Sequence, residues 1–235
     1  MHEYYRKNKG KLQKEMDGYL KLVRSEIEEV FGKSYPQAFA EIWTCYEQEM
    51  LEHFPFIGGD SSSGTRNLTG CMFFVAVGVV GKKYGLSTNG WGLLATTHFD
   101  WTPLLLRLLA GGLLSRCPGL VTRVLKKKDK RNAENAAKNP GSFLTQTMEP
   151  TEEYSMIYHN LVCPIYEFCK ERGYMEYLPY MCNLDYVMFR AFGVSLYREK
   201  TCAAGDGVCD FKIKRGAPIP DVWPPHILDA SDPLK

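Results

Sequence analysis

Apolar positions recur with helical spacing through the first half of the chain. Within residues 11–31 they lie three or four apart, which is typical of an amphipathic helix that buries one face. The positions concerned are Leu12, Met16, Leu20, Val23, Ile27 and Val30. Residues 36–53 continue the helical pattern, and the segment FPFIGGDSSSG that follows is typical of a turn.

The next stretch, up to residue 139, is also predicted to be helical. Residues 67–83 form a strongly apolar helix candidate, and Gly85 is placed to end it. Ser87 is a candidate N-cap for a short helix over 88–96. Residues 102–138 predict two helices, separated at Cys117-Pro118-Gly119.

After Asn139-Pro140-Gly141 the pattern changes to alternation, which is typical of strands. Residues 142–149 and 152–160 predict a strand pair. Residues 194–203 and 207–215 predict a hairpin around Gly205-Asp206-Gly207. Between the two pairs, one helix runs from Pro164 to a C-terminal Gly173, and a second covers about 176–191.

This order predicts an α+β fold: a helical N-terminal half packed with a C-terminal antiparallel sheet of about four strands, with helices on one face. We expect a helical region over 1–139 and a β/helix region over 140–216. The Pro-rich residues 217–235 predict an extended tail. At 235 residues the chain is long enough to bury a sizeable core, and the regions are expected to form one compact unit.

Composition narrows the classes of partner. The formal net charge is +2, which favours neither nucleic acid nor a membrane surface as a partner. The longest apolar run, residues 71–80, is too short to span a bilayer, and the N-terminus lacks the apolar stretch of a secretory signal. These features predict a cytoplasmic protein that acts on a small molecule, and the apolar first half is compatible with a homo-oligomer.

Candidate chemistry gathers in the second half. Cys182 and Asp185 are three residues apart on a predicted helix and so share a face. An acidic residue on an otherwise apolar helix needs a partner or a task. Cys163 directly precedes a predicted helix, whose macrodipole would lower the pKa of the thiol and favour the nucleophilic thiolate. Cys209 lies early in the last predicted strand.

Other interpretations of the eight cysteines remain open. The spacings contain no C-x-x-C, and without a secretory signal reduced thiols are expected. A free cysteine is often only a small buried apolar residue, which is how we interpret Cys45, Cys71, Cys117, Cys169 and Cys202. Alternatively, Cys163, Cys182 and Cys209 would bind a soft metal or an iron–sulfur cluster, although their spacing is unlike that of ferredoxins.

The same segment resembles a known family. The pattern is a cysteine, a helix and a glycine, a second cysteine followed three residues later by aspartate, then threonine, glycine and a Cys-Asp-Phe strand. It is similar to the C-terminal pattern of the L-2-amino-thiazoline-4-carboxylic acid hydrolase family, and the upstream segment from FPFIGG to YGLS resembles that family too, so that the resemblance covers about residues 50–215. The pattern falls here on Cys163, Gly173, Cys182, Asp185, Thr201, Gly205, Cys209, Asp210 and Phe211.

The resemblance implies a hydrolase that opens a cyclic amidine, converting a thiazoline ring to an N-carbamoyl-cysteine product. It makes Cys163, Cys182, Asp185 and Cys209 the candidate catalytic residues, with a cysteine as nucleophile or metal ligand and Asp185 as general base or orienting group. No cofactor is required by this interpretation. An alternative is a non-catalytic small-molecule-binding or sensor domain related to vinyl-reductase modules.

Three further residues are candidates for substrate binding. Arg190 and Arg198 are placed to clamp the ring carboxylate, because a guanidinium binds a carboxylate through paired hydrogen bonds. His159, on a predicted strand close to Cys163, is a candidate for proton transfer, although a strand position that faces solvent is the explanation we favour for it.

Overall fold

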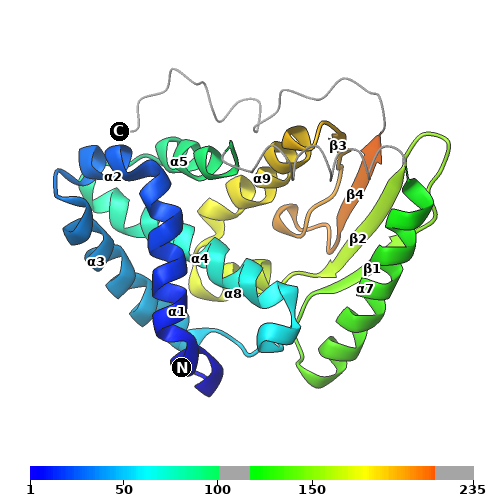
Figure 1. The fold of residues 1–235 in the computed structure, drawn as a ribbon, viewed down its shortest axis with the longest axis horizontal. Coiled ribbons are helices and arrows are strands. Elements are labelled where there is room, and N and C mark those ends of the chain that lie inside the picture. The colour runs from blue at the N-terminus through cyan, green and yellow to red at the C-terminus, as the bar shows by residue number, and fades with distance from the viewer. Residues whose placement is uncertain (101–116, 215–235) are drawn as a thin grey trace.

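The computed structural model describes residues 1–100 and 117–214. Figure 1 shows helices on one side of the molecule and a sheet on the other, joined by helices that lie between them. The N-terminal helices are α1 (Glu3–Leu20), α2 (Arg24–Phe31), α3 (Tyr35–Cys45), α4 (Ser63–Gly81) and α5 (Thr88–Asp100). The remaining helices are α7 (Pro118–Lys138), α8 (Pro164–Arg172) and α9 (Leu178–Ala191).

The helical stripe predicted over residues 11–31 is buried but not continuous. A short 3-10 turn, Lys21–Val23, separates α1 from α2. Leu20, Val23 and Ile27 are all fully or almost fully buried across this turn. The tighter turn therefore keeps the apolar side chains on one side, and for that reason the hydrophobic period alone does not reveal the break.

The helical core is centred on α4, whose apolar residues are buried nearly all round. Gly78 of α4 allows a close approach: a Cβ atom there would lie 2.4 Å from the ring of Tyr177. That ring packs edge-on against Trp91 of α5, with centroids 4.9 Å apart. Ser87 caps α5 as predicted, its hydroxyl accepting from the Gly90 amide at 2.9 Å.

The sheet has four antiparallel strands in the order β1-β2-β4-β3. They are β1 (Leu144–Met148), β2 (Met156–Val162), β3 (Ser195–Tyr197) and β4 (Cys209–Lys214). The α+β fold predicted from the sequence is thus confirmed. Helix α8 starts at Pro164 and ends at Gly173, which has the left-handed φ of +80° that glycine adopts without strain.

The first strand of the hairpin predicted over 194–203 and 207–215 is shorter than expected, because β3 ends at Tyr197. The buried Asp210 carboxylate accepts the backbone N–H groups of Glu199 and Lys200, at 3.0 and 2.6 Å. Those amides are therefore drawn away from strand pairing. A longer loop results, which carries Arg198 and the 3-10 turn Cys202–Ala204 before the chain returns in β4.

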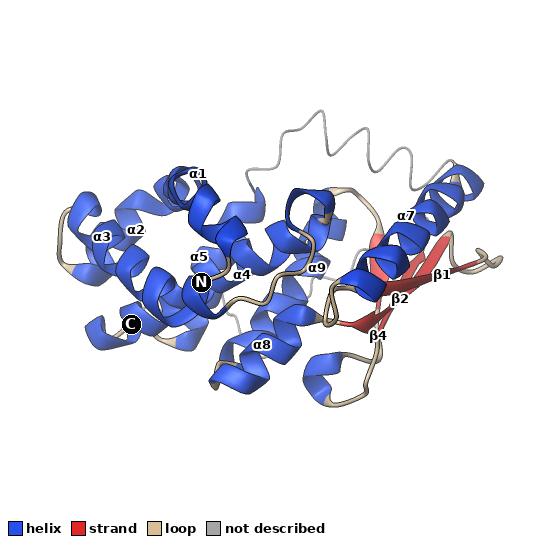
Figure 2. Cartoon of the chain, turned by 90° about the horizontal axis from the view of Figure 1, so that it is seen from below, coloured by secondary structure: helices blue, strands red, loops and turns tan. Residues whose placement is uncertain are grey.

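Helices cover one face of the sheet. Helix α7 lies across β1 and β2, and α9 packs against β3 (Figure 2). The predicted boundary at residue 139 does not separate two cores, since α7 packs on the sheet and α8 and α9 enter the helical core. The predicted tail over 217–235 and the first helix predicted within 102–138 fall almost wholly outside the described residues.

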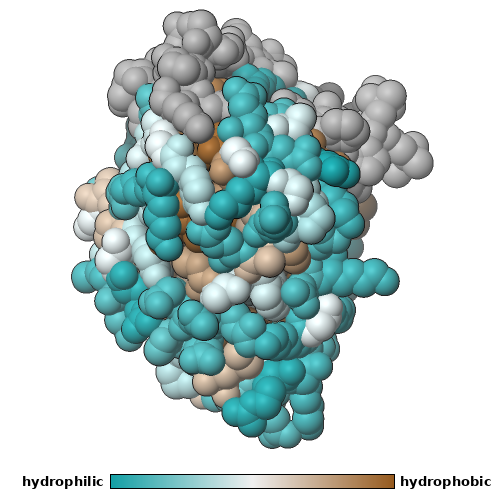
Figure 3. Space-filling model, turned by 90° about the vertical axis from the view of Figure 1, so that its left-hand side faces the viewer, coloured by the Kyte–Doolittle hydropathy of each residue, from teal (hydrophilic) through white to brown (hydrophobic). Residues whose placement is uncertain are grey.

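The outer surface of the N-terminal helices is mainly hydrophilic. Figure 3 views this side of the molecule, where apolar side chains show chiefly in a furrow between polar ones. That distribution is expected of amphipathic helices whose apolar stripes face a shared core. Among the described residues, no helix combines the length and apolar character that a membrane span requires.

Candidate functional site

A cavity of about 660 Å³ lies between α7, the covered face of the sheet and α9. The start of α4 and the start of α8 complete its walls. Strand alternation decides which sheet residues face it: Tyr158 and Asn160 of β2 line it, as do their register partners Phe211 and Cys209 of β4. The site is therefore assembled from segments that are far apart in the sequence.

Four thiols line this cavity, each from a different element. Cys71 comes from α4, Cys163 from the position before α8, Cys182 from α9 and Cys209 from the start of β4. The backbone N–H of Cys202 donates to the Cys209 sulfur at 3.2 Å. The fold thus brings the three cysteines singled out in the sequence to one cavity and adds Cys71, which was expected to be only structural.

An ion pair joins Asp185 of α9 to Arg198 of the loop after β3, with an N–O distance of 2.8 Å. The Arg198 side chain is only 2% exposed, whereas that of Asp185 is 32% exposed and lines the cavity. Arg198 also donates to the Cys182 carbonyl at 2.8 Å and to the Asn183 side chain at 3.1 Å. The guanidinium is therefore held by protein acceptors and fixes the carboxylate in place.

Aromatic rings support the same guanidinium. Arg198 lies 5.1 Å from the ring centre of Tyr186 and 5.3 Å from that of Phe211, distances typical of cation–π contacts. Phe211 in turn stacks on Tyr158, with centroids 4.5 Å apart and planes 10° apart. This packing leaves Arg198 little freedom to turn toward another acceptor.

The Asp185 carboxyl has a raised pKa. Burial of the group favours its uncharged form, and the attraction of Arg198 and its hydrogen bond offset that effect only in part. A carboxylate whose pKa is raised is a stronger base than an ordinary aspartate.

Residues 101–213 match the family model described as L-2-amino-thiazoline-4-carboxylic acid hydrolase. This part of the chain is similar to that family. The match includes all four candidate catalytic residues, and it confirms the family to which the motif pointed. The upstream resemblance, residues 50–100, lies outside the match. No curated protein and no solved structure shows a significant match to the chain.

Most of the other hydrolase-family positions have structural roles around the cavity. Thr201 caps the turn Cys202–Ala204, accepting from the Ala204 amide, and Gly205 ends that turn with a φ of +91°. Asp210 holds the loop that carries Arg198 through the amides of Glu199 and Lys200. The family pattern thus combines cavity-lining groups with residues that fix the loop beside them.

The predicted nucleophilic thiolate at Cys163 is not supported. Burial raises the pKa of this thiol to about 11, although the backbone N–H groups of Tyr166 and Ile165 at the start of α8 lower it. Burial likewise raises the pKa of Cys182 well above its ordinary value, with Arg198 opposing. The helix N-terminus acts in the predicted direction, but desolvation outweighs it.

Two predicted substrate-binding residues lie away from the cavity. His159 pairs with Asp210, between the cavity-facing positions 158 and 160, and so projects from the opposite face of the sheet. Arg190, near the end of α9, is not among the described residues that line the cavity. Arg198 does line it, but its described N–H contacts are to protein acceptors.

A polar network that sequence reasoning missed lies on the wall formed by α7 and β1. The Asp129 carboxylate accepts the hydroxyl of Thr145 and the backbone N–H of Thr147, both at 2.6 Å. Asn132 donates to Thr145 at 2.8 Å. In the sequence, Asp129 lies within a run of basic residues, a pattern that does not indicate a cavity-lining polar network.

The alternative of a metal or cluster site gains no support from the arrangement. Within the part of the chain that the structure describes, no three His, Cys, Asp or Glu side chains are grouped as a metal ion would require. The cavity cysteines therefore face a common space without forming a recognisable ligand set.

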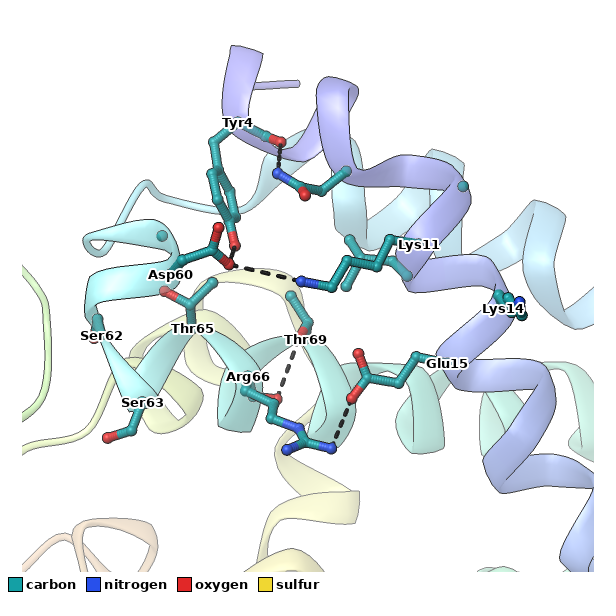
Figure 4. Close-up of a pocket in the computed structure, with 14 residues that line it drawn as sticks. Tyr4, Lys11, Lys14, Glu15, Asp60, Ser62, Ser63, Thr65, Arg66 and Thr69 are labelled. Atoms are coloured by element: carbon teal, nitrogen blue, oxygen red, sulfur yellow. Dashed lines mark hydrogen bonds and ion pairs between the residues drawn. The ribbon is translucent and has the colours of Figure 1, made fainter.

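A second concavity, a groove of about 830 Å³, lies between α1 and the start of α4 (Figure 4). Its polar side chains pair with one another. Tyr4 donates to Asp60 at 2.8 Å, Lys11 lies 3.9 Å from the same carboxylate, and Arg66 pairs with Glu15 at 2.9 Å. The groove lies outside the family match and holds no thiol.

Proposed function

We propose that the cavity is the active site of a hydrolase that opens a small cyclic amidine, of the thiazoline type, to an N-carbamoyl-cysteine product. The observation that carries the proposal is the Asp185 carboxylate: its pKa is raised, Arg198 holds it, and it faces a thiol-lined cavity. Family membership supports hydrolase chemistry in general. The bond and the substrate are our inference.

The reaction consumes one water molecule. Asp185 takes a proton from water as the water oxygen bonds to the ring carbon between sulfur and nitrogen. The C=N bond to the ring nitrogen becomes a single bond, and that nitrogen takes the remaining hydroxyl proton as the oxygen becomes the carbonyl oxygen of a urea. The carbon–sulfur bond then breaks with its electron pair on sulfur, and the departing sulfur takes the proton back from Asp185. One carboxyl group therefore acts first as base and then as acid, and no proton is gained or lost overall.

The remaining cavity groups assist this route. Arg198 keeps the carboxylate oriented and prevents its pKa from rising further. The thiols of Cys163, Cys182 and Cys209 offer a soft, weakly polar surface that suits the ring sulfur. A second route starts with Cys182, which lies one helical turn before Asp185 and would attack the ring carbon after losing its proton to that carboxylate. The ring carbon–sulfur bond breaks, the departing sulfur takes that proton from Asp185, and water then hydrolyses the isothiourea left on Cys182, which frees the thiol and the urea product.

Asp185→Asn tests the base directly. We expect kcat/KM for L-2-amino-thiazoline-4-carboxylate to fall by about 10²-fold or more, measured by mass spectrometry of the N-carbamoyl-cysteine formed. Asp60→Asn, in the groove between α1 and α4, is the matched control and should retain activity. Equal turnover by the wild type and Asp185→Asn would contradict the assignment.

Cysteine variants separate the two routes. If water is the nucleophile, Cys182→Ala should lower kcat/KM far less than Asp185→Asn does, and no covalent adduct should appear in the intact protein mass. A loss as large as that of Asp185→Asn, together with an adduct present in the wild type and absent from Cys182→Ala, would establish the thiol route. Cys45→Ala, outside the cavity, is the control.

A second candidate function is non-catalytic binding of a small molecule. It is favoured by the lining of the cavity, which is mostly apolar and whose charged pair is already satisfied within the protein. This function predicts a ligand that co-purifies with the protein and is released unchanged, with no turnover of cyclic amidines.

A further inference from the structure

The polar groups of the cavity make most of their contacts with one another. Arg198 bonds Asp185, the Cys182 carbonyl and Asn183, while Asp129 is held by Thr145 and the Thr147 amide. A ligand covered in charged groups would have to break these contacts, at the cost of leaving buried polar atoms unpaired. The lining is therefore poorly matched to a densely charged ligand.

What remains available to a ligand is largely apolar. Apolar side chains from α7, from α9 and from the residues just before β1 and just after α9 contribute to the lining. They are Val121, Leu125, Phe143, Met188, Phe189 and Phe192. The thiols of Cys71, Cys163 and Cys182 add to this character, because burial raises their pKa and keeps them protonated. The cavity thus has a polar end at Asp185 and an extended apolar wall.

The volume of the cavity also favours a ligand with a large apolar part. A cavity of about 660 Å³ is in the range that encloses a drug-sized ligand, whereas a thiazoline carboxylate is much smaller. Val124 of α7 lines the cavity and is nevertheless 56% exposed, so the rim on that side is apolar and accessible from solvent. Space and chemistry both accommodate an apolar extension of the substrate.

We propose that the substrate is a cyclic amidine that carries a bulky apolar substituent, with the amidine at Asp185 and the substituent against Leu125, Phe189 and Phe192. This inference rests on the proposed hydrolase function for the reacting end of the molecule. The affinity contributed by the apolar wall does not depend on turnover, because it comes from burial of apolar surface.

The test compares two compounds, 2-amino-thiazoline-4-carboxylate and its 2-benzylamino counterpart. Opening of either adds one water, breaks the carbon–sulfur bond and yields a carbamoyl cysteine that mass spectrometry detects. We expect kcat/KM to be at least tenfold higher for the benzylamino compound. Leu125→Trp, which fills the apolar wall, should remove this preference.

Leu120→Trp is the matched control, because Leu120 lies on the same helix but is 51% exposed and does not line the cavity. It should keep the preference. Thermal melting of both variants identifies any loss that comes from misfolding. Equal kcat/KM for the two compounds, or a preference that survives in Leu125→Trp, would overturn the inference while leaving the hydrolase proposal intact.

Calorimetry of ligand binding to the Asp185→Asn variant distinguishes failure of this inference from failure of the hydrolase proposal. Tighter binding of the benzylamino compound, lost in Leu125→Trp, supports the apolar wall even if neither compound is ever opened, in which case only the hydrolase proposal fails. Equal and weak binding of both compounds would reject the apolar substrate class whatever the turnover.

Discussion

The groove and the cavity of this protein differ in how exposed their charged side chains are. The groove between α1 and α4 is the larger, about 830 Å³ against 660 Å³, yet its ion pairs are exposed: the side chain of Arg66 is 72% exposed and that of Lys11 is 70% exposed. In the cavity beside the sheet, Arg198 is 2% exposed and its partner carboxyl has a raised pKa.

The difference shows that volume is a poor guide to chemistry. Exposed pairs are screened by water and contribute little to stability. A pair removed from water is costly to form and therefore needs a purpose, and its members acquire altered proton affinities. On this criterion we propose that the cavity beside the sheet, and not the groove, is the functional site.

The largest effect is expected from removing the guanidinium. Arg198→Met leaves the Asp185 carboxylate, the Cys182 carbonyl and the Asn183 side chain without their partner, so we expect a loss of about 3–5 kcal/mol in the free energy of unfolding. Arg66→Met, the same change in the groove, should cost about 0–1 kcal/mol because that pair is exposed. Urea denaturation of both variants measures the two values.

The double variant Arg198→Met with Asp185→Leu sharpens this comparison. Removing both charges eliminates the unpaired buried carboxylate, so it should recover most of the stability lost in Arg198→Met. Similar small losses for Arg198→Met and Arg66→Met would mean that the two concavities do not differ in the way described.

An intermediate effect is expected in the pH dependence of stability. The folded protein holds the proton of Asp185 more tightly than the unfolded chain does, because burial raises this pKa above its ordinary 3.8. Relative to Asp185→Asn, the wild type should therefore gain stability as the pH falls through the raised pKa toward 3.8, by at most about 1.4 kcal/mol per pH unit. Above the raised pKa the difference should be constant.

Asp210, on the other side of the sheet, provides a control of opposite sign. Burial raises its pKa, but the amides of Lys200 and Glu199 and the Lys212 ammonium outweigh burial and lower it below 3.8. Relative to Asp210→Asn, the wild type should lose stability as the pH falls from 3.8 through that lowered pKa. Chemical denaturation across the acid range measures both slopes, and slopes of the same sign would contradict the assignment.

The sequence predicts the local structure around the cavity well, because the signals are local. Pro164 and Gly173 bracket α8, and the spacing of Cys182 and Asp185 places both on the cavity side of α9. Alternation likewise predicts the strands. It does not settle which face of β2 is buried, and a shift of one residue separates His159, which faces outward, from Asn160, which lines the cavity.

Long-range effects could not be predicted in the same way. The pairing of Arg198 with Asp185 depends on the early end of β3 and on Asp210, which holds the loop. The pKa of Cys163 depends on a balance between helix amides and burial, and burial is set by α4 and the sheet rather than by the neighbouring sequence. The local sequence therefore predicts that the helix amides lower the pKa of Cys163, but it does not predict the net shift.

The smallest effect concerns two buried hydroxyls, one beside the groove and one beside the cavity. Thr65 borders the groove and Thr147 borders the cavity; both are at most 8% exposed, and neither hydroxyl oxygen has a hydrogen-bond partner among the described residues. Valine has nearly the same shape and removes the unpaired oxygen. Thr65→Val and Thr147→Val should therefore each change the free energy of unfolding by less than about 1 kcal/mol, in the stabilising direction. A clear destabilisation by Thr147→Val alone would show that the cavity supplies its hydroxyl with a partner, such as ordered water, that the groove does not supply to Thr65.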